Sequence, residues 1–104
     1  MKDKIHTYIG FALKAGKVRL GVNAICTIKG QVPLLLLCNT ASENTKKETL
    51  KIAKKYNSVI VLVKNERLED IFYKENCKLA AVLDQSLATA ILDNLNENFE
   101  QFGG

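Results

Sequence analysis

Features that the sequence lacks exclude several classes of protein. The 104 residues include one histidine and three cysteines. Cys26, Cys38 and Cys77 are odd in number, widely spaced and without a Cys-x-x-Cys pair, so neither a disulfide framework nor a zinc knuckle is expected. No apolar run approaches the roughly 20 residues that a membrane-spanning helix needs. We therefore expect reduced, buried thiols, no bound metal or cofactor, and no association with a membrane.

Sequence motifs of enzymes are also missing. There is no glycine-rich dinucleotide fingerprint and no P-loop. His6 lies in the first expected helix, apart from any serine or cysteine constellation, and is expected at the surface or a helix end. Asp84 follows an expected strand, where catalytic acids occur, but it is better placed to cap the next helix. Glu69 and Asp70 are neighbours on a helix and point in different directions. We expect no catalytic activity.

Positive charge is concentrated in residues 1–64. This part contains 12 of the 15 lysines and arginines and three acids, a balance of +9, whereas residues 65–104 contain three basic and eight acidic residues, a balance of −5. Such an asymmetry favours a polyanionic partner on one side of the molecule. Small basic proteins without such a partner are also common.

Hydrophobic periodicity predicts helices that alternate with short apolar strands in one domain, residues 1–104. This order is typical of an α/β protein, a three-layer α/β/α sandwich with a small central mixed sheet. Residues 98–104 are expected to fray. Helices are expected over residues 3–15, 22–29, 42–56, 66–73 and 85–96, and strands over residues 18–20, 34–38, 59–63 and 79–83.

The expected helix over residues 42–56 has a clear polarity. Ser42 is a suitable N-cap, and five lysines crowd the outer side of the later turns, which is usual for a solvated face. Leu50, Ala53 and Tyr56 are expected to form its inner face. The next strand is rich in β-branched residues and is expected to be buried.

Lys14 to Asn23, with the sequence KAGKVRLGVN, joins the first two expected helices. Gly16 is placed to end the first helix in the left-handed conformation. Gly21 stands just ahead of the second helix, whose first backbone N–H groups lack intrahelical partners. Beside Lys17 and Arg19, such a helix start is suited to a phosphate or a nucleotide edge. A plain connection with solvated lysines is the alternative interpretation.

With these elements in order, the chain resembles the kink-turn-binding ribosomal-protein superfamily of the "L seven Ae" type, and within it the small bacterial YlxQ-like branch. The similarity covers roughly residues 9–92. Its most specific part is the segment ASENTKK. The matching segments are Gly10–Val18, Gly21–Asn23, Leu34–Cys38, Ala41–Lys47, Ala80–Asp84 and Ala88–Ile91.

The resemblance implies a protein that binds structured RNA, either kink-turn-like or ribosomal, without catalysis. In this superfamily the start of the second helix enters the groove beside tandem sheared G·A pairs and carries a Gly-x-Asn-Glu-x-x-Lys motif. Gly21 and Asn23 match the motif, whereas Ala24 replaces its Glu and Thr27 its Lys. The family's loop before the last strand covers a flipped-out nucleotide; here it is YKENCKL, without the usual glycine. Weaker base discrimination is therefore expected, with phosphate contacts retained.

The expected RNA-binding residues come from the segment between the first two helices, from the turn after the second strand and from this later loop. Lysines and Arg19 are expected to contact phosphates, and Asn23 to contact a guanine edge. They are Lys14, Lys17, Arg19, Gly21, Val22, Asn23, Thr27, Lys29, Thr40, Lys74, Asn76 and Lys78.

Two alternatives to direct RNA binding remain open. The chain could be a protein-interaction module that uses its acidic last third, or an RNA-recognition subunit for a separate RNA-modifying enzyme. Its start has no signal-peptide pattern, so a cytoplasmic location is expected. We also expect a monomer, since no long exposed apolar helix face is evident, with possible association with the ribosome.

Overall fold

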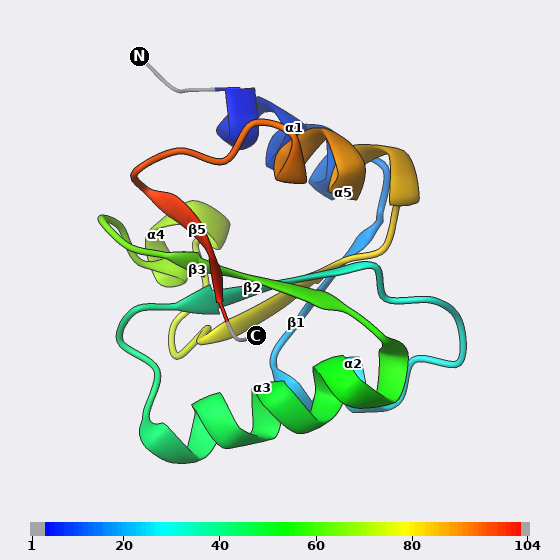
Figure 1. Ribbon diagram of the computed structural model, residues 1–104, viewed down its shortest axis with the longest axis vertical. Coiled ribbons are helices and arrows are strands. Elements are labelled where there is room, and N and C mark those ends of the chain that lie inside the picture. The colour runs from blue at the N-terminus through cyan, green and yellow to red at the C-terminus, as the bar shows by residue number, and fades with distance from the viewer. Residues whose placement is uncertain (1–3, 103–104) are drawn as a thin grey trace.

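The computed structural model describes residues 4–102, which form a five-stranded mixed sheet between two layers of helices (Figure 1). The α/β sandwich expected from the sequence is therefore confirmed. The helices are α1 (Lys4–Lys14), α2 (Val22–Cys26), α3 (Glu43–Tyr56), α4 (Leu68–Phe72) and α5 (Gln85–Leu92). The strands are β1 (Val18–Leu20), β2 (Leu34–Cys38), β3 (Val59–Val63), β4 (Leu79–Val82) and β5 (Phe99–Phe102).

The strands lie in the order β1-β4-β2-β3-β5. Within residues 4–102, only β2 and β3 are parallel, with Leu36 opposite Val61, and the other strand pairs are antiparallel. The helix α3 makes the crossover that a parallel pair requires. As a result β1 and β5 are the two edges of the sheet.

The leucine run of β2 fills both faces of the sheet. Successive side chains of a strand point to opposite faces. Leu34 and Leu36 accordingly pack in the cluster with α1 and α5, and Leu35 and Leu37 in the cluster with α2 and α3. All of β2 is fully buried, as its continuous apolar sequence predicts.

Helix ends follow the expected capping chemistry. Gly16 has φ 68° and ends α1, and the Lys17 N–H donates to the carbonyl oxygen of Ala12 (2.9 Å), as in a Schellman motif. The side chain of Ser42 accepts from the Thr45 N–H (3.1 Å) at the start of α3. Asp84 accepts from the Leu87 N–H (2.9 Å), which confirms its interpretation as the cap of α5.

Three helices are shorter than their periodicity predicts. The second helix ends at Cys26 rather than at residue 29, because Thr27 turns back and donates its hydroxyl to the carbonyl oxygen of Ala24 (2.8 Å). The helix α4 covers only Leu68–Phe72, with Tyr73 in the left-handed conformation at φ 54°. The last helix, α5, ends at Leu92.

Two side chains are more exposed than the sequence predicts. Leu50 is 46% exposed and lies at the margin of the inner face of α3. That face is formed by Thr49 and Ile52, with Ala53 and Tyr56 partly buried against the same cluster, as predicted. Cys26 is exposed rather than on the inner side of α2, where Ile25 is the buried residue. Helical spacing leaves the phase of a face uncertain by one residue, and the packing partners decide it.

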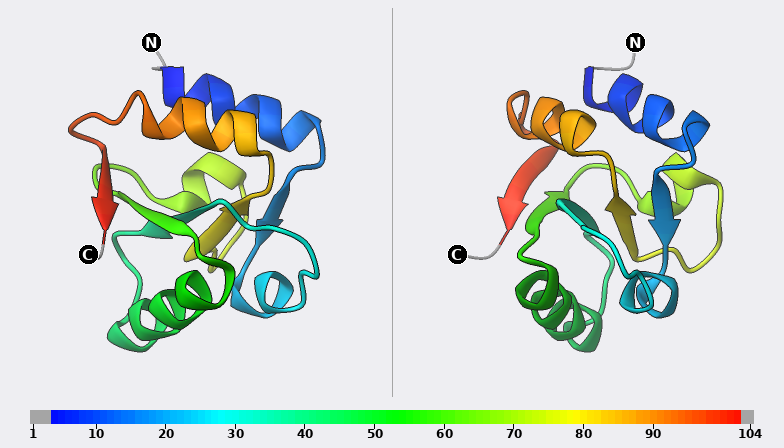
Figure 2. Two further views of the ribbon diagram at one scale, coloured as in Figure 1. Left: turned by 45° about the vertical axis from the view of Figure 1, so that its right-hand side comes forward. Right: turned by 90° about the vertical axis from the view of Figure 1, so that its right-hand side faces the viewer.

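The expectation that residues 98–104 fray was wrong for Phe99–Phe102. These residues form β5, which pairs with β3 at the sheet edge (Figure 2). Phe99 is fully buried opposite Val63. Its burial in the cluster under α1 and α5 stabilises the last segment of the described chain. Residues 103 and 104 lie outside the described part.

Residues 4–102 contain no helix that is long and apolar enough to cross a membrane. Within the same residues, no group of three or more His, Cys, Asp or Glu side chains is placed to hold a metal ion.

Native-state thiol labelling should distinguish the three cysteines. Cys26 is exposed, whereas Cys38 and Cys77 are buried, and burial raises the pKa of the Cys77 thiol. Since the thiolate is the reactive form, we expect rapid modification of Cys26 at neutral pH and modification of the other two only after unfolding. A chromogenic disulfide reagent measures this, with Cys26→Ser as control. Rapid reaction of the Cys26→Ser variant would contradict the placement.

Candidate nucleic-acid interface

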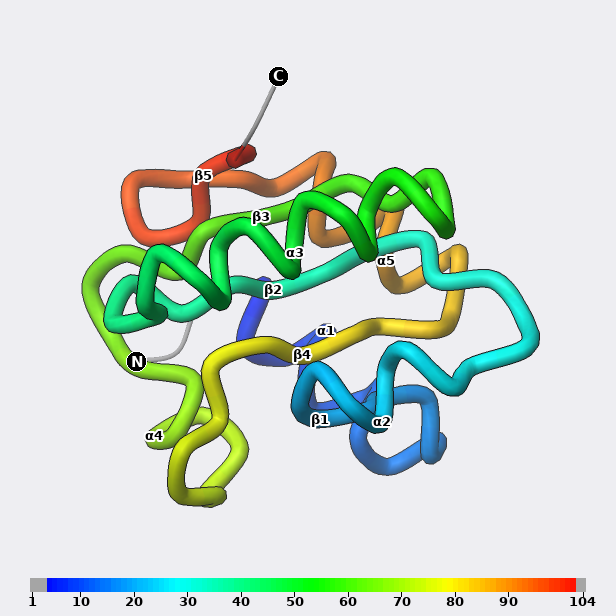
Figure 3. Tube along the Cα trace, turned by 90° about the horizontal axis from the view of Figure 1, so that it is seen from below, coloured from blue at the N-terminus to red at the C-terminus, as the bar shows by residue number. Residues whose placement is uncertain are grey.

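Four connections meet at one end of the sheet. Because β1 and β2 are antiparallel to β4, their last residues lie beside the beginning of β4. The strand β3 runs parallel to β2 and therefore finishes at the same end of the sheet. The turns that lead into α2, α3, α4 and β4 therefore come together, and Figure 3 shows α2 beside β1 and β4 at this edge.

Gly21 fixes the start of α2 against β4. Its φ of 90° lies in a region that favours glycine, and its N–H donates to the carbonyl oxygen of Leu79 (2.9 Å). The first intrahelical bond runs from the Ile25 N–H to the Gly21 carbonyl oxygen (3.1 Å). The N–H groups of Val22 and Asn23 thus belong to the first turn, where the helix dipole favours an anion.

Lys78 links two of the connections. Its ammonium donates to the Thr40 hydroxyl (2.9 Å) and to Glu69 (2.9 Å). The second carboxylate oxygen of Glu69 accepts from the Asn76 N–H (3.2 Å), and Asn76 is in the left-handed conformation at φ 58°. The structure therefore brings Thr40, Asn76 and Lys78 together, next to Gly21.

An acid at the centre of this group was not expected from the sequence. The Lys78 ammonium is the main cause that lowers the pKa of Glu69, and the Asn76 N–H lowers it further against the opposing effect of burial. The pair therefore persists at neutral pH and is lost only as the pH falls through this lowered pKa. Lys78 is consequently a residue that orders the loop, with its charge largely offset by Glu69.

Asn39 is a second residue that the sequence did not indicate. Its side-chain amide donates to the carbonyl oxygens of Val63 (2.9 Å), Lys64 (3.0 Å) and Glu66 (2.8 Å). These bonds tie the turn after β2 to the connection between β3 and α4. The only sequence signal is a polar side chain directly after a buried strand.

The remaining expected cations lie along β1 and around the far end of α2. Arg19 is opposite Ala81 and so points to the sheet face that carries α2, although its guanidinium turns back to the carbonyl oxygens of Gly16 and Val18. The carbonyl oxygen of Lys17 accepts from the N–H of Leu83. Leu83 comes four residues after Leu79, the residue that Gly21 contacts, so the two contacts lie about 13 Å apart along the direction of β4.

Lys14 is exposed at the end of α1 and Lys29 is exposed after α2. Thr27 caps the end of α2 and uses its hydroxyl within the helix. These residues are separated from the Gly21 end of the interface by the length of a short helix or strand. The expected site is thus a surface in two parts, with Lys14, Lys17 and Lys29 apart from the α2 start.

The far end of α2 is held by α3. The Tyr56 hydroxyl lies 2.7 Å from the carbonyl oxygen of Ile28 and 3.1 Å from that of Ile25. The Lys55 ammonium donates to the carbonyl oxygen of Cys26 (3.2 Å). These contacts satisfy carbonyl groups that a helix end leaves unpaired. They give this five-residue helix a fixed position on the sheet.

In the loop before β4, Tyr73 is 86% exposed and Lys74 is also exposed.

His6 lies in the first turn of α1, at a helix end, which is one of the two places expected for it, but its side chain is largely buried. Its imidazole lies 2.6 Å from the Glu66 carboxylate and edge-on to the Phe99 ring, with 15% of its side chain exposed. It joins α1 to the connection that precedes α4.

No protein-family model matches this chain. No curated protein sequence matches it either. The chain is similar in structure to a protein with unknown function from Bacillus halodurans C, with a TM-score of 0.70 and 26% sequence identity. The match covers 89% of this chain and 100% of that one. The likeness supports the fold and assigns no activity.

Proposed function

We propose that this protein is a cytoplasmic, non-catalytic RNA-binding protein of the kink-turn-binding type. Structured RNA would lie across the start of α2, with phosphates near Arg19 and Lys74, and would extend along β1 to Lys17. The observation that carries the proposal is the bond from Gly21 to Leu79, which places the first turn of α2 beside Thr40, Asn76 and Lys78. The excess of positive charge in residues 1–64 supports it.

The chemistry at the α2 start suits RNA better than a small substrate. Backbone N–H groups at a helix start bind phosphate without reading sequence. The exposed Asn23 amide offers both a donor and acceptors for a base edge. Lys78 and Glu69 keep the neighbouring loop in one conformation. Association with the ribosome and a monomeric state are part of the same proposal.

The two departures from the family motif predict weak discrimination. Ala24 is exposed and offers no polar side-chain atom, and the Thr27 hydroxyl is already bonded to the Ala24 carbonyl oxygen. Ala24→Glu with Thr27→Lys should therefore raise the preference for a kink-turn over a Watson–Crick duplex. Each restored base contact contributes about 1–3 kcal/mol.

Binding of both RNAs by the natural chain and by this double variant, at two salt concentrations, tests the proposal. Phosphate contacts predict affinities that fall steeply with salt for both RNAs. If neither RNA binds in a salt-dependent way, the proposed function is wrong. If the natural chain already discriminates as sharply as the double variant, the loop before β4 supplies the specificity instead of α2.

A further inference from the structure

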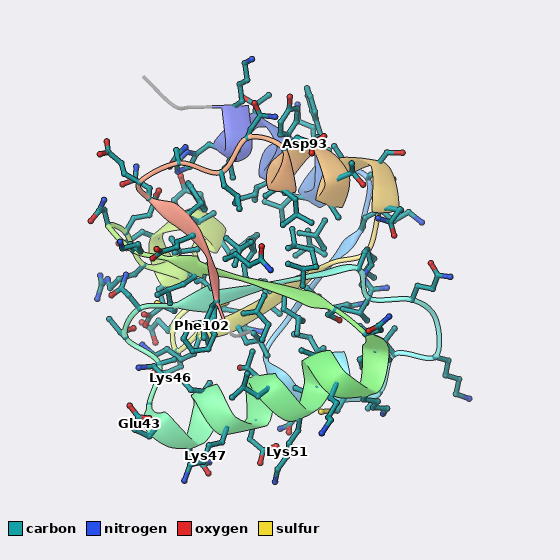
Figure 4. The ribbon with its side chains drawn as sticks, viewed as in Figure 1. Glu43, Lys46, Lys47, Lys51, Asp93 and Phe102 are labelled. Carbon is teal, nitrogen blue, oxygen red and sulfur yellow. The ribbon has the colours of Figure 1, made fainter. Side chains whose placement is uncertain are left out.

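A groove between α3 and the β5 edge lies apart from the proposed RNA surface. We call it the α3–β5 groove; it has a volume of about 270 Å³ and is lined chiefly by Leu50, Ala53, Lys54, Val59, Ile60 and Phe102. None of these residues is among the RNA-binding residues expected from the sequence. Figure 4 shows Phe102 on the side of the sheet that faces α3, above its first turns.

The rim of the groove combines an exposed apolar residue with cations. Lys46, Leu50 and Lys54 follow at intervals of four along α3 and therefore share one face of the helix. Leu50 is 46% exposed. Lys46 lies 3.5 Å from Glu43, a surface pair that contributes little, and Lys54 forms no ion pair within residues 4–102. An apolar strip between two cations is thus open to a ligand.

The opposite wall of the groove is the edge of the sheet. Within residues 4–102, β5 pairs with β3 on one side and with no strand on the other. An unpaired edge presents N–H and C=O groups that an extended segment can use. Its acid, Glu100, lies 3.3 Å from Lys64 in an exposed ion pair that offsets only part of its negative charge. The free backbone edge and the lysines thus favour an extended partner of negative charge.

We propose that the α3–β5 groove docks an extended acidic segment of a protein partner. The segment would pair with the free edge of β5, place an apolar side chain between Leu50 and Phe102, and bring carboxylates to Lys46 and Lys54. A nucleic acid would use the lysines but leave the apolar strip unfilled. This proposal does not depend on RNA binding at α2.

A synthetic peptide with acids on both sides of a central Leu-Ser-Phe segment is the probe, since its two apolar side chains point to one face when extended. Measured by fluorescence anisotropy near physiological salt, Lys54→Glu and Leu50→Ser should each weaken binding about tenfold. The matched controls are Lys51→Glu, on the outer side of α3 (Figure 4), and Leu13→Ser, an exposed leucine on α1. Both controls should leave the affinity within about twofold.

Other ligands test whether the apolar side chains and the backbone of the peptide contribute to binding. A peptide with serine in place of Leu and Phe should bind at least about tenfold more weakly, and N-methylation of alternate amides should weaken binding through loss of the β5 pairing. Equal binding of the serine peptide, equal loss with Lys51→Glu and Lys54→Glu, or no saturable binding would overturn the proposal. The proposal would also be overturned if a duplex RNA bound with an affinity that depends on Lys54 while the acidic peptide did not bind. Because Lys54 is exposed, we expect Lys54→Glu to fold normally. This variant therefore tests the groove even if Leu50→Ser fails to fold.

Discussion

Replacement of Phe99 by alanine should lower the free energy of unfolding by about 3–5 kcal/mol, the range for a large buried aromatic side chain. Phe99 is fully buried, packs in the cluster under α1 and α5, and contacts the His6 ring edge-on. Its loss would leave a cavity and would weaken the hold of β5 on β3. Urea unfolding followed by circular dichroism measures the change.

Tyr73→Ala is the matched control, because Tyr73 is an aromatic residue that is 86% exposed. Its removal should change the free energy of unfolding by no more than about 0.5 kcal/mol. A Phe99→Ala variant as stable as Tyr73→Ala would show that residues 99–102 do not belong to the folded core.

The double variant Lys17→Glu with Arg19→Glu should lower the affinity for structured RNA by more than about tenfold at moderate salt, because two phosphate attractions become repulsions. Both residues are exposed, and Arg19 lies on the sheet face that carries α2. The stability of the protein should change little, since surface substitutions of this kind shift it by about 0.5 kcal/mol or less. Anisotropy titration with a labelled kink-turn RNA measures the affinity.

Lys47→Glu with Lys51→Glu makes the same change of net charge on the outer side of α3 and is the control. It should reduce RNA affinity far less than the β1 variant. Equal losses from the two double variants would mean that net charge, and not the proposed surface, governs binding.

The parts of the fold that local sequence determines were predicted correctly. The left-handed Gly16, the Ser42 and Asp84 caps and the apolar run of β2 each carry their own structural preference. The pairing of β5 with β3 could not be read in this way. The segment NFEQF contains no pattern that indicates which strand it pairs with, and its partner β3 lies 36 or more residues earlier in the chain. Such long-range pairing depends on the assembled sheet.

The site shows the same division between local and long-range information. Gly21 as the residue ahead of a helix was evident from the sequence, but its bond to Leu79 required the register of β1 on β4. The contacts of Asn39 and of Glu69 with Lys78 join residues that only the fold brings close. Charge counting therefore placed Lys78 among the free cations, whereas the structure pairs it with an acid.

Binding of RNA at the start of α2 can be observed by chemical-shift mapping of the ¹⁵N-labelled protein with an unlabelled kink-turn RNA. We expect the largest changes on the amides of Gly21, Val22 and Asn23 and on the loop from Lys74 to Lys78, and little change on the amides that face the α3–β5 groove. Changes confined to α3 and β5, or no changes with the RNA in molar excess over the protein, would contradict RNA binding at the start of α2.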